Sequence, residues 1–173
     1  MKHLLITVFV LTSFIGYSQD IPKFELTMDG VSPIIINIDS INAEAIYKKT
    51  LNWVQESYKT PKEVLKTNIE NEKIRVDGFK KNAWFYKSLG VTNSYDMEYS
   101  FEIEFKDNKI RLTFTPGQFW ANNQKVLYDY KTFFKNSGEV KGAYKDAKPS
   151  LEQSMNALVS SLYNYIKGKK SDW

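Results

Sequence analysis

The feature that most constrains the fold of this chain is an alternation of apolar and polar residues between Asp96 and Pro116. Its apolar positions are Met97, Tyr99, Phe101, Ile103 and Phe105 and, after a break at Asp107-Asn108, Ile110, Leu112 and Phe114. A period of two is typical of a strand with one buried face, and a short polar break between two such runs indicates a hairpin turn. Full burial of each of these side chains contributes about 2 kcal/mol. We therefore expect a β-hairpin that forms the floor of the hydrophobic core.

Shorter alternating runs predict further strands around this hairpin. They cover residues 23–28, 33–39, 64–69 and 73–79. The segment 80–94 contains Gly90 and Asn93 and predicts a loop or an irregular edge. Residues 117–148 are long for a structureless connection, so we expect hidden elements or a functional loop there. Within them, Phe133-Phe134 and Val140 predict a short strand pair.

Two segments have the spacing of an amphipathic helix. Residues 41–58 follow Ser40, which is a good N-cap, and they end before Pro61. The last helix is expected to begin at Pro149 and to stop at Gly168, with lysines flanking its end. Because helices and runs of strands are segregated along the chain, we expect an α+β fold. It has an antiparallel sheet of five or more strands with two helices packed on one face.

The N-terminal residues predict export. After the basic Lys2, the apolar run 4–15 is shorter than the roughly 20 residues of a transmembrane helix, and Gly16-Tyr17-Ser18 has the small residues of a cleavage site. We expect a signal peptide over residues 1–18, a single domain over 19–173 and a periplasmic or secreted location. We also expect no transmembrane segment after cleavage. The chain has no cysteine, so we expect no cysteine-linked lipid anchor and a core that is stable without disulfides.

The charge balance argues against nucleic acid as a partner. Removal of the predicted signal peptide, which contains one lysine, lowers the formal net charge from +4 to +3. Such a small excess does not favour nucleic acid or an anionic membrane. In addition, Glu98, Glu102 and Glu104 share one face of the central hairpin and would repel phosphate groups there.

Three stretches of the sequence carry a resemblance to a known family. They are Tyr47-Lys-Lys-Thr-Leu-Asn-Trp53-Val, Lys73-Ile-Arg-Val-Asp-Gly78-Phe and Tyr99-Ser-Phe-Glu-Ile-Glu-Phe-Lys-Asp-Asn-Lys-Ile-Arg111. Across residues 24–114 the chain resembles a family of exported bacterial proteins that carries a domain of unknown function with a TATA-binding-protein-like fold. The resemblance implies this fold and export, and it implies no particular activity.

The residue types present exclude several catalytic chemistries. The single histidine, His3, lies in the predicted signal peptide and cysteine is absent, so the mature chain has no Ser-His or Cys-His system and no zinc site built on these residues. Glu98, Glu102 and Glu104 are the right residue type for an acid and base pair. Ion pairing across strands explains them better, with the partners Lys73, Arg75, Lys109 and Arg111. We therefore expect no enzyme, no cofactor and no metal.

Aromatic residues are concentrated in the segments that have no clear assignment. A candidate ligand-binding patch consists of Trp84, Phe85, Tyr86, Phe119 and Trp120, because exposed aromatic clusters mark binding surfaces. The alternative is that these segments fold back over the core as lids. The patch predicts a non-enzymatic domain that binds a protein or a component of the cell envelope. The alternative function is a carrier of a small apolar ligand in a cavity between the sheet and the C-terminal helix.

Overall fold

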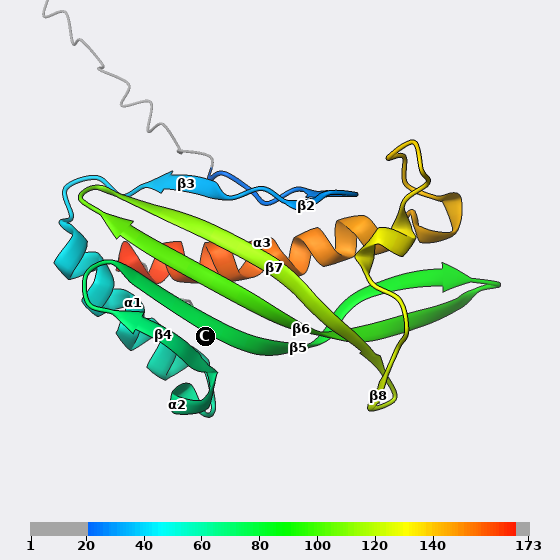
Figure 1. Cartoon of the computed structure of the whole chain (residues 1–173), viewed down its shortest axis with the longest axis horizontal. Coiled ribbons are helices and arrows are strands. Elements are labelled where there is room, and N and C mark those ends of the chain that lie inside the picture. Colours follow the sequence, from blue (N-terminus) through cyan, green and yellow to red (C-terminus); the bar gives the residue numbers. More distant parts are fainter. Residues whose placement is uncertain (1–20, 169–173) are drawn as a thin grey trace, which may run out of the picture.

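A six-stranded antiparallel sheet forms the centre of the computed structural model, which describes residues 21–168 (Figure 1). In spatial order its strands are β3 (Ile34–Asn37), β7 (Lys109–Ala121), β6 (Val91–Lys106), β5 (Lys73–Ser88) and β4 (Leu65–Ile69), and β8 (Gln124–Lys125) pairs with the end of β7. A separate ribbon contains β1 (Leu26–Thr27) and β2 (Gly30–Val31). Helices α1 (Ala43–Ser57) and α3 (Ala147–Ile166) cover one face of the sheet. The predicted fold class is therefore confirmed.

The central hairpin is formed by β6 and β7, as the alternation predicts. The two strands meet at the turn Asp107-Asn108, where Asn108 adopts a φ of 62°. The alternate apolar side chains, among them Phe101 and Leu112, are completely buried under α1 and α3. Phe101 packs against Trp53 of α1, with a ring centroid distance of 6.2 Å. We call this packed layer between the sheet and the two helices the main core.

The segment 80–94 is largely a β-hairpin, so the expected loop is wrong, whereas the expected irregularity is found at its base, where the register shifts between Lys80 and Trp84. β5 and β6 pair through Trp84↔Tyr95 to Ser88↔Val91 and turn at Leu89-Gly90. We call residues 83–95 the arm, which projects beyond the rest of the sheet (Figure 1). Its strand character is hidden in the sequence because β5 carries two extra residues between Lys80 and Trp84, opposite β6, and Ala83 and Trp84 are buried in succession, which interrupts the period of two.

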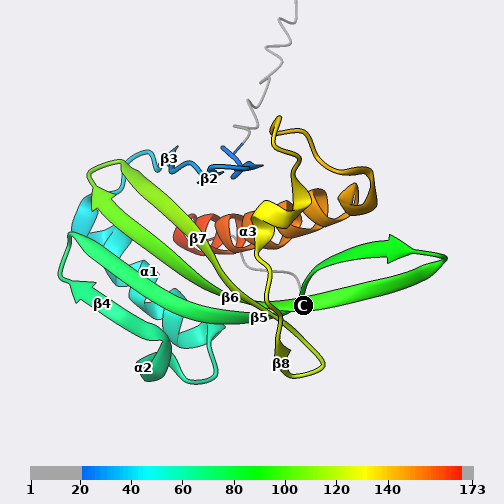
Figure 2. The same cartoon turned by 45° about the vertical axis from the view of Figure 1, so that its right-hand side comes forward.

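The long segment 117–148 contains hidden elements, as expected. β7 continues to Ala121, β8 follows, and two short 3₁₀ helices come next, η1 (Tyr130–Phe133) and η2 (Gly142–Tyr144). The predicted strand pair is reduced to a single bridge between Phe134 and Val140. In Figure 2 this segment lies over the base of the arm and beside the start of α3.

Polar side chains of α3 replace missing strand partners on both sides of the helix. Asn156 binds both main-chain groups of Phe24, at 2.7 and 3.0 Å, and Glu152 accepts a hydrogen bond from the main-chain N–H of Leu26 at 2.8 Å. On the other side, Ser154 donates to the carbonyl of Ala83 at 2.6 Å. The predicted strand at residues 23–28 is shortened to β1, because side chains of α3, and not another strand, form the main-chain hydrogen bonds of Phe24 and of the Leu26 N–H.

The first residues of the two long helices differ from the expected positions by two residues. Asn42, and not Ser40, is the N-cap of α1, and its side chain accepts a hydrogen bond from the N–H of Ala45 at 2.9 Å. Ser40 has a φ of 65° and belongs to the preceding turn. α3 begins at Ala147, so Pro149 lies in its first turn, where the main-chain N–H has no helical partner in any case. Gly168, with a φ of 68°, follows the helix as predicted.

α2 (Pro61–Val64) is a single helical turn that connects α1 to β4. In the described part of the chain, no helix combines the length and the apolar composition that a bilayer-spanning segment requires. The predicted signal peptide, residues 1–18, and the lysines after Gly168 lie outside the described residues.

Candidate functional site

The structure separates the five predicted site residues into three places. Trp84 and Phe119 are completely buried, whereas Phe85, Tyr86 and Trp120 are half-buried. Trp84, Tyr86 and Phe119 share one aromatic cluster at the base of the arm. Phe85 and Trp120 lie elsewhere, so the sequence-predicted patch is not one continuous surface.

The distal cluster, as we call it, lies between the arm and the segment 126–146. It consists of Trp84, Tyr86, Tyr95, Phe119, Tyr128, Phe133 and Tyr144. Trp84 is its centre, since its ring stacks on Tyr95 at 4.2 Å and meets Phe133 edge to face at 4.7 Å. The Trp84 Nε1–H is buried without a hydrogen-bond partner among the described residues. The cluster thus holds the arm to the body through aromatic contacts from six segments of the chain.

Tyrosine hydroxyl groups make up the polar side of the distal cluster. Burial is the main cause that raises the pKa of Tyr95, Tyr128 and Tyr144 above the ordinary value of 10.0. For Tyr86 the main cause is its hydrogen bond with Tyr95, and its pKa is raised as well. All four side chains therefore remain neutral at physiological pH, and their chemistry is that of packing and hydrogen bonding.

Phe85 lies on the opposite face of the arm and anchors it to α3 through its main chain. Its N–H donates to Ser150 Oγ at 3.1 Å, and Ser150 in turn donates to the carbonyl of Ala147 at 3.0 Å. Ser150 is almost completely buried. At the start of the arm, the outward main-chain groups of β5 therefore form hydrogen bonds with side chains of α3 rather than with another strand.

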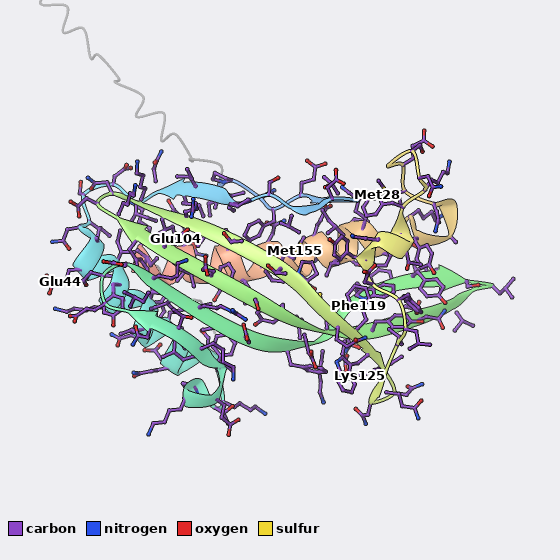
Figure 3. The ribbon with its side chains drawn as sticks, viewed as in Figure 1. Met28, Glu44, Glu104, Phe119, Lys125 and Met155 are labelled. Carbon is purple, nitrogen blue, oxygen red and sulfur yellow. The ribbon has the colours of Figure 1, made fainter. Side chains whose placement is uncertain are left out.

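Trp120 belongs to a patch on the face of the sheet that carries no helix. We define the open-face patch as Phe79, Glu98, Trp120 and Lys125, which come from β5, β6, β7 and β8. The Phe79 and Trp120 rings meet edge to face at 6.3 Å, and Trp120 Nε1–H donates to Glu98 Oε1 at 3.1 Å. Lys125 Nζ lies 5.3 Å from the Trp120 ring centroid, and Figure 3 labels Lys125 at this end of the sheet.

The Phe79 side chain is the exposed part of this patch. It is 49% exposed, although a large aromatic side chain ordinarily seeks burial. Because the hydrogen bond to Glu98 and the cation above the ring hold Trp120 in place, the pair forms a rigid apolar surface. A rigid aromatic pair with polar neighbours is the arrangement found at the centres of protein interfaces.

Ion pairs cover the end of the same sheet face that lies next to the β6–β7 turn. Lys73 Nζ lies 3.0 Å from Glu102 and 3.8 Å from Glu104, and Arg111 also pairs with Glu104. The Arg111 guanidinium is the main cause that holds the pKa of Glu104 below its ordinary value. These contacts confirm the cross-strand pairing predicted for Lys73 and Arg111. The carboxylates of Glu102 and Glu104 are therefore held in ion pairs.

Arg75 has a different partner from the one expected. Its guanidinium donates to both carboxylate oxygens of Asp77, at 2.9 and 3.0 Å, and Ser100 Oγ donates to Asp77 at 2.7 Å. Burial raises the pKa of Asp77, but these hydrogen bonds outweigh it and the pKa is lowered. Among residues 21–168 no group of three or more Asp, Glu, His or Cys residues is arranged to hold a metal ion.

Phe79 and Lys125 are not among the site residues predicted from the sequence. The sequence does contain a signal for the exposure of Phe79. Ile74 and Val76 face the core, and the same period of two places Phe79 on the opposite face of the strand. Lys125 has no such signal, since its position over Trp120 depends on the tight turn at Asn122-Asn123, where both residues have positive φ.

Comparisons with known proteins agree with the architecture. A family model described as "Domain of unknown function (DUF4468) with TBP-like fold" matches residues 34–120, about half of the chain. A TBP-like protein from Parabacteroides distasonis ATCC 8503 is 15% identical, with a TM-score of 0.61, over 80% of this chain and 93% of that one. A DUF4468 family protein from Bacteroides ovatus ATCC 8483 is 13% identical, with a TM-score of 0.59, over 84% of this chain and 90% of that one. No curated protein matches the chain.

Proposed function

Since the chain belongs to the DUF4468 family of domains with a TBP-like fold, whose function is unknown, we propose that it is a non-enzymatic exported domain that binds a protein partner. The partner is a protein of the cell envelope or one exported with it. The binding surface in this proposal is the sheet face without helices, centred on Phe79 and Trp120. Export is part of the proposal and rests on the sequence of residues 1–18.

The exposed aromatic pair carries this proposal. Phe79 and Trp120 meet across β6, although they are far apart in sequence, and two polar residues, Glu98 and Lys125, hold Trp120 in position. An isolated domain gains nothing from an apolar pair exposed to water, whereas an interface gains binding energy when such rings are covered. Rigid rings also lose little conformational entropy on binding.

The surroundings of the pair favour a protein over a nucleic acid. Glu98 lies within the patch, and Glu102 and Glu104 follow it along β6 on the same face. The cations Lys73 and Arg111 on this face are held in ion pairs by Glu102 and Glu104, so they are not free to bind the phosphate groups that supply most of the affinity of proteins for nucleic acid. Balanced ion pairs around an apolar centre are instead typical of the rim of a protein interface.

The carrier function has less support from the described residues. Large rings fill the space between the sheet and α3, with Phe24 at 6.4 Å from Phe101 and 5.9 Å from Phe114. An apolar groove with a volume of about 570 Å³ does exist, but it opens on the surface between α1 and α2. Native mass spectrometry of the purified protein tests this alternative, since a carrier retains a small apolar molecule and an empty chain shows only its own mass.

The proposed function is tested by photo-cross-linking in the cells that produce the protein. A photoreactive phenylalanine analogue at position 79 is expected to yield one dominant protein adduct that mass spectrometry can identify. The matched control places the analogue at Glu139, an exposed residue in the turn after Phe134. The adduct should be lost in the Trp120→Ala background, and circular dichroism should show that this variant keeps its fold.

Two results would contradict the proposal. One is an adduct yield at position 79 that does not exceed the yield at position 139. The other is an adduct that persists unchanged when Trp120 is replaced, because the cross-linked partner would then not depend on the aromatic pair.

A further inference from the structure

The β6 strand of the arm has one edge without a strand partner. Val91–Tyr95 pair with β5 on one side, but β7 pairs with β6 only from Asp96 onward. Beyond that point the arm and the end formed by β7 and β8 diverge in both views (Figures 1 and 2). The result is a fork in which the second edge of residues 91–95 has no strand partner among the described parts of the chain. An unpaired edge is a template for another strand.

The usual protection of such an edge is missing here. Natural edge strands carry lysine, proline or a bulge that prevents pairing with another chain. The segment Val91-Thr92-Asn93-Ser94-Tyr95 has no charged residue and no proline, although a quarter of the whole chain is charged. No register shift occurs between Trp84 and Ser88 on the paired strand, so the arm has no bulge beyond the one at its base.

The tip of the arm supports the same interpretation. Leu89 is fully exposed and has a φ of 48°, and Gly90 follows with a φ of 78°. These angles define the tight hairpin turn in which Asn-Gly is preferred, because asparagine tolerates positive φ better than leucine does. Val91 beside it is 60% exposed. An apolar side chain in a strained and exposed position indicates that the tip has a role other than the stability of the isolated chain.

The hydrogen-bonding pattern defines which main-chain groups are available. The pair that flanks a two-residue hairpin turn, Ser88↔Val91, is hydrogen-bonded within the hairpin, and alternate pairs repeat this arrangement. The main-chain groups of Thr92 and Ser94 therefore point away from β5. Phe85, which pairs with Ser94, confirms this alternation because its N–H points outward to Ser150 Oγ.

We propose that the free edge of β6 in the arm pairs with the same edge of a second copy of this chain to form a symmetric dimer. With the two-fold axis at Asn93, Thr92 of each copy lies opposite Ser94 of the other, and both residues of each such pair have outward main-chain groups. Val91 then lies opposite Tyr95, a pairing of β-branched and aromatic side chains that stabilises antiparallel sheets.

A second copy is the occupant favoured by the side chains of this segment. In the antiparallel dimer Asn93 lies opposite its own symmetry mate, and the other residues of the segment lie opposite uncharged residues. The segment therefore contains no like charges that would oppose the pairing. The dimer joins two hairpins into one four-stranded sheet, which is more stable than a two-stranded hairpin. Because only five residues pair on each side, we expect a weak dimer whose population depends on protein concentration.

A disulfide trap at the symmetry axis tests this inference. Residues at a non-hydrogen-bonded antiparallel position have Cα atoms about 4.5 Å apart, within the range that a disulfide bridges. In the otherwise cysteine-free chain, the Asn93→Cys variant should form a covalent dimer about tenfold faster than the Ser88→Cys variant, because pairing raises the local thiol concentration. Ser88 is the more exposed of the two, so random collision would favour the control.

A charge exchange gives an independent measurement by analytical ultracentrifugation. The wild-type chain should show a monomer–dimer equilibrium. Asn93→Lys and Asn93→Asp should each be monomeric, since each places like charges opposite one another, and an equimolar mixture of the two variants should recover the dimer. The Ser88→Lys variant, which adds the same charge on the other strand of the arm, should sediment as the wild type does.

Specific results would overturn the dimer. It is wrong if Asn93→Cys cross-links no faster than Ser88→Cys. It is also wrong if the wild-type chain stays monomeric up to its solubility limit, or if both charged variants sediment as the wild type does. Near-UV circular dichroism, which reports the packing of Trp84 and its tyrosine neighbours, shows whether the arm remains folded in each variant.

Discussion

The main core and the distal cluster are both built from large buried rings, yet they differ in how their residues come together. In the main core, rings such as Phe101 and Phe114 lie on regular strands and pack under two long helices. In the distal cluster, Trp84 is surrounded by residues from the arm, the end of β7 and the segment 126–146. The comparison indicates that the main core stabilises the whole fold and that the distal cluster positions one projecting hairpin.

The two regions also differ in polarity. Four tyrosines contribute hydroxyl groups to the distal cluster, and the indole N–H of Trp84 has no partner in the described chain. In the main core, by contrast, the indole N–H of Trp53 has a hydrogen-bond partner, because it donates to Ser161 Oγ of α3 at 3.0 Å. An unpaired buried donor lowers stability, so we expect the distal cluster to open at lower free energy than the main core.

The largest expected effect comes from a truncation in the main core. Phe101→Ala should lower the free energy of unfolding of the whole chain by about 4 kcal/mol, because it leaves a cavity among Trp53, Phe24 and Phe114. Urea denaturation measures this change, and Thr115→Ala on the exposed face is the control. If Phe101→Ala costs no more than the control, the main core does not carry the stability of the fold.

A smaller and local effect is expected from the distal cluster. Trp84→Ala should destabilise the arm by about 3 kcal/mol, because the residue is completely buried against Tyr95 and Phe133. Hydrogen exchange should accelerate in residues 83–95 and remain slow in α1. Trp120→Ala, which removes a half-buried indole from the open face, is the matched control and should change stability by less than about 1 kcal/mol. Equal exchange rates in the arm and in α1 of the Trp84→Ala variant would show that the two regions are one cooperative unit.

The smallest expected effect concerns alkaline pH. The pKa values of Tyr95, Tyr128 and Tyr144 are raised by burial in the folded chain, so an unfolded arm releases their protons more readily. The stability that comes from these raised values is complete below the ordinary pKa of 10.0 and is lost as the pH rises through the folded-state values. In an alkaline titration, the ultraviolet absorbance of tyrosinate should therefore appear at a higher pH in the wild type than in the Trp84→Ala variant. Identical titration curves would show that the cluster does not protect these hydroxyl groups.

The comparison also shows how far local patterns predict structure. The β6–β7 hairpin is predicted correctly because eight consecutive register pairs from Tyr99 to Lys106 obey one period of two, apart from the bulge that precedes them. The arm is missed because three residues of β5, 81–83, face only one residue of β6, and Ala83 and Trp84 are buried in succession, so the alternation is interrupted just where the aromatic run begins. For the candidate site, the aromatic character of the region is predicted, but its division into a buried cluster and an exposed pair is not.

The sequence by itself determines the strands of the central hairpin, the two long helices and the α+β class, because each depends on contacts that repeat every two or every three to four residues. Outside this hairpin, in the segments 80–94 and 117–148, only the tertiary structure decides which aromatic residues are buried. Trp84 is covered because Phe133 and Tyr128 reach it from a distant segment. Trp120 remains at the surface because the bulge between Pro116 and Phe119 places it on the open face, beside Phe79. These outcomes depend on long-range packing, which leaves no periodic signal along the chain.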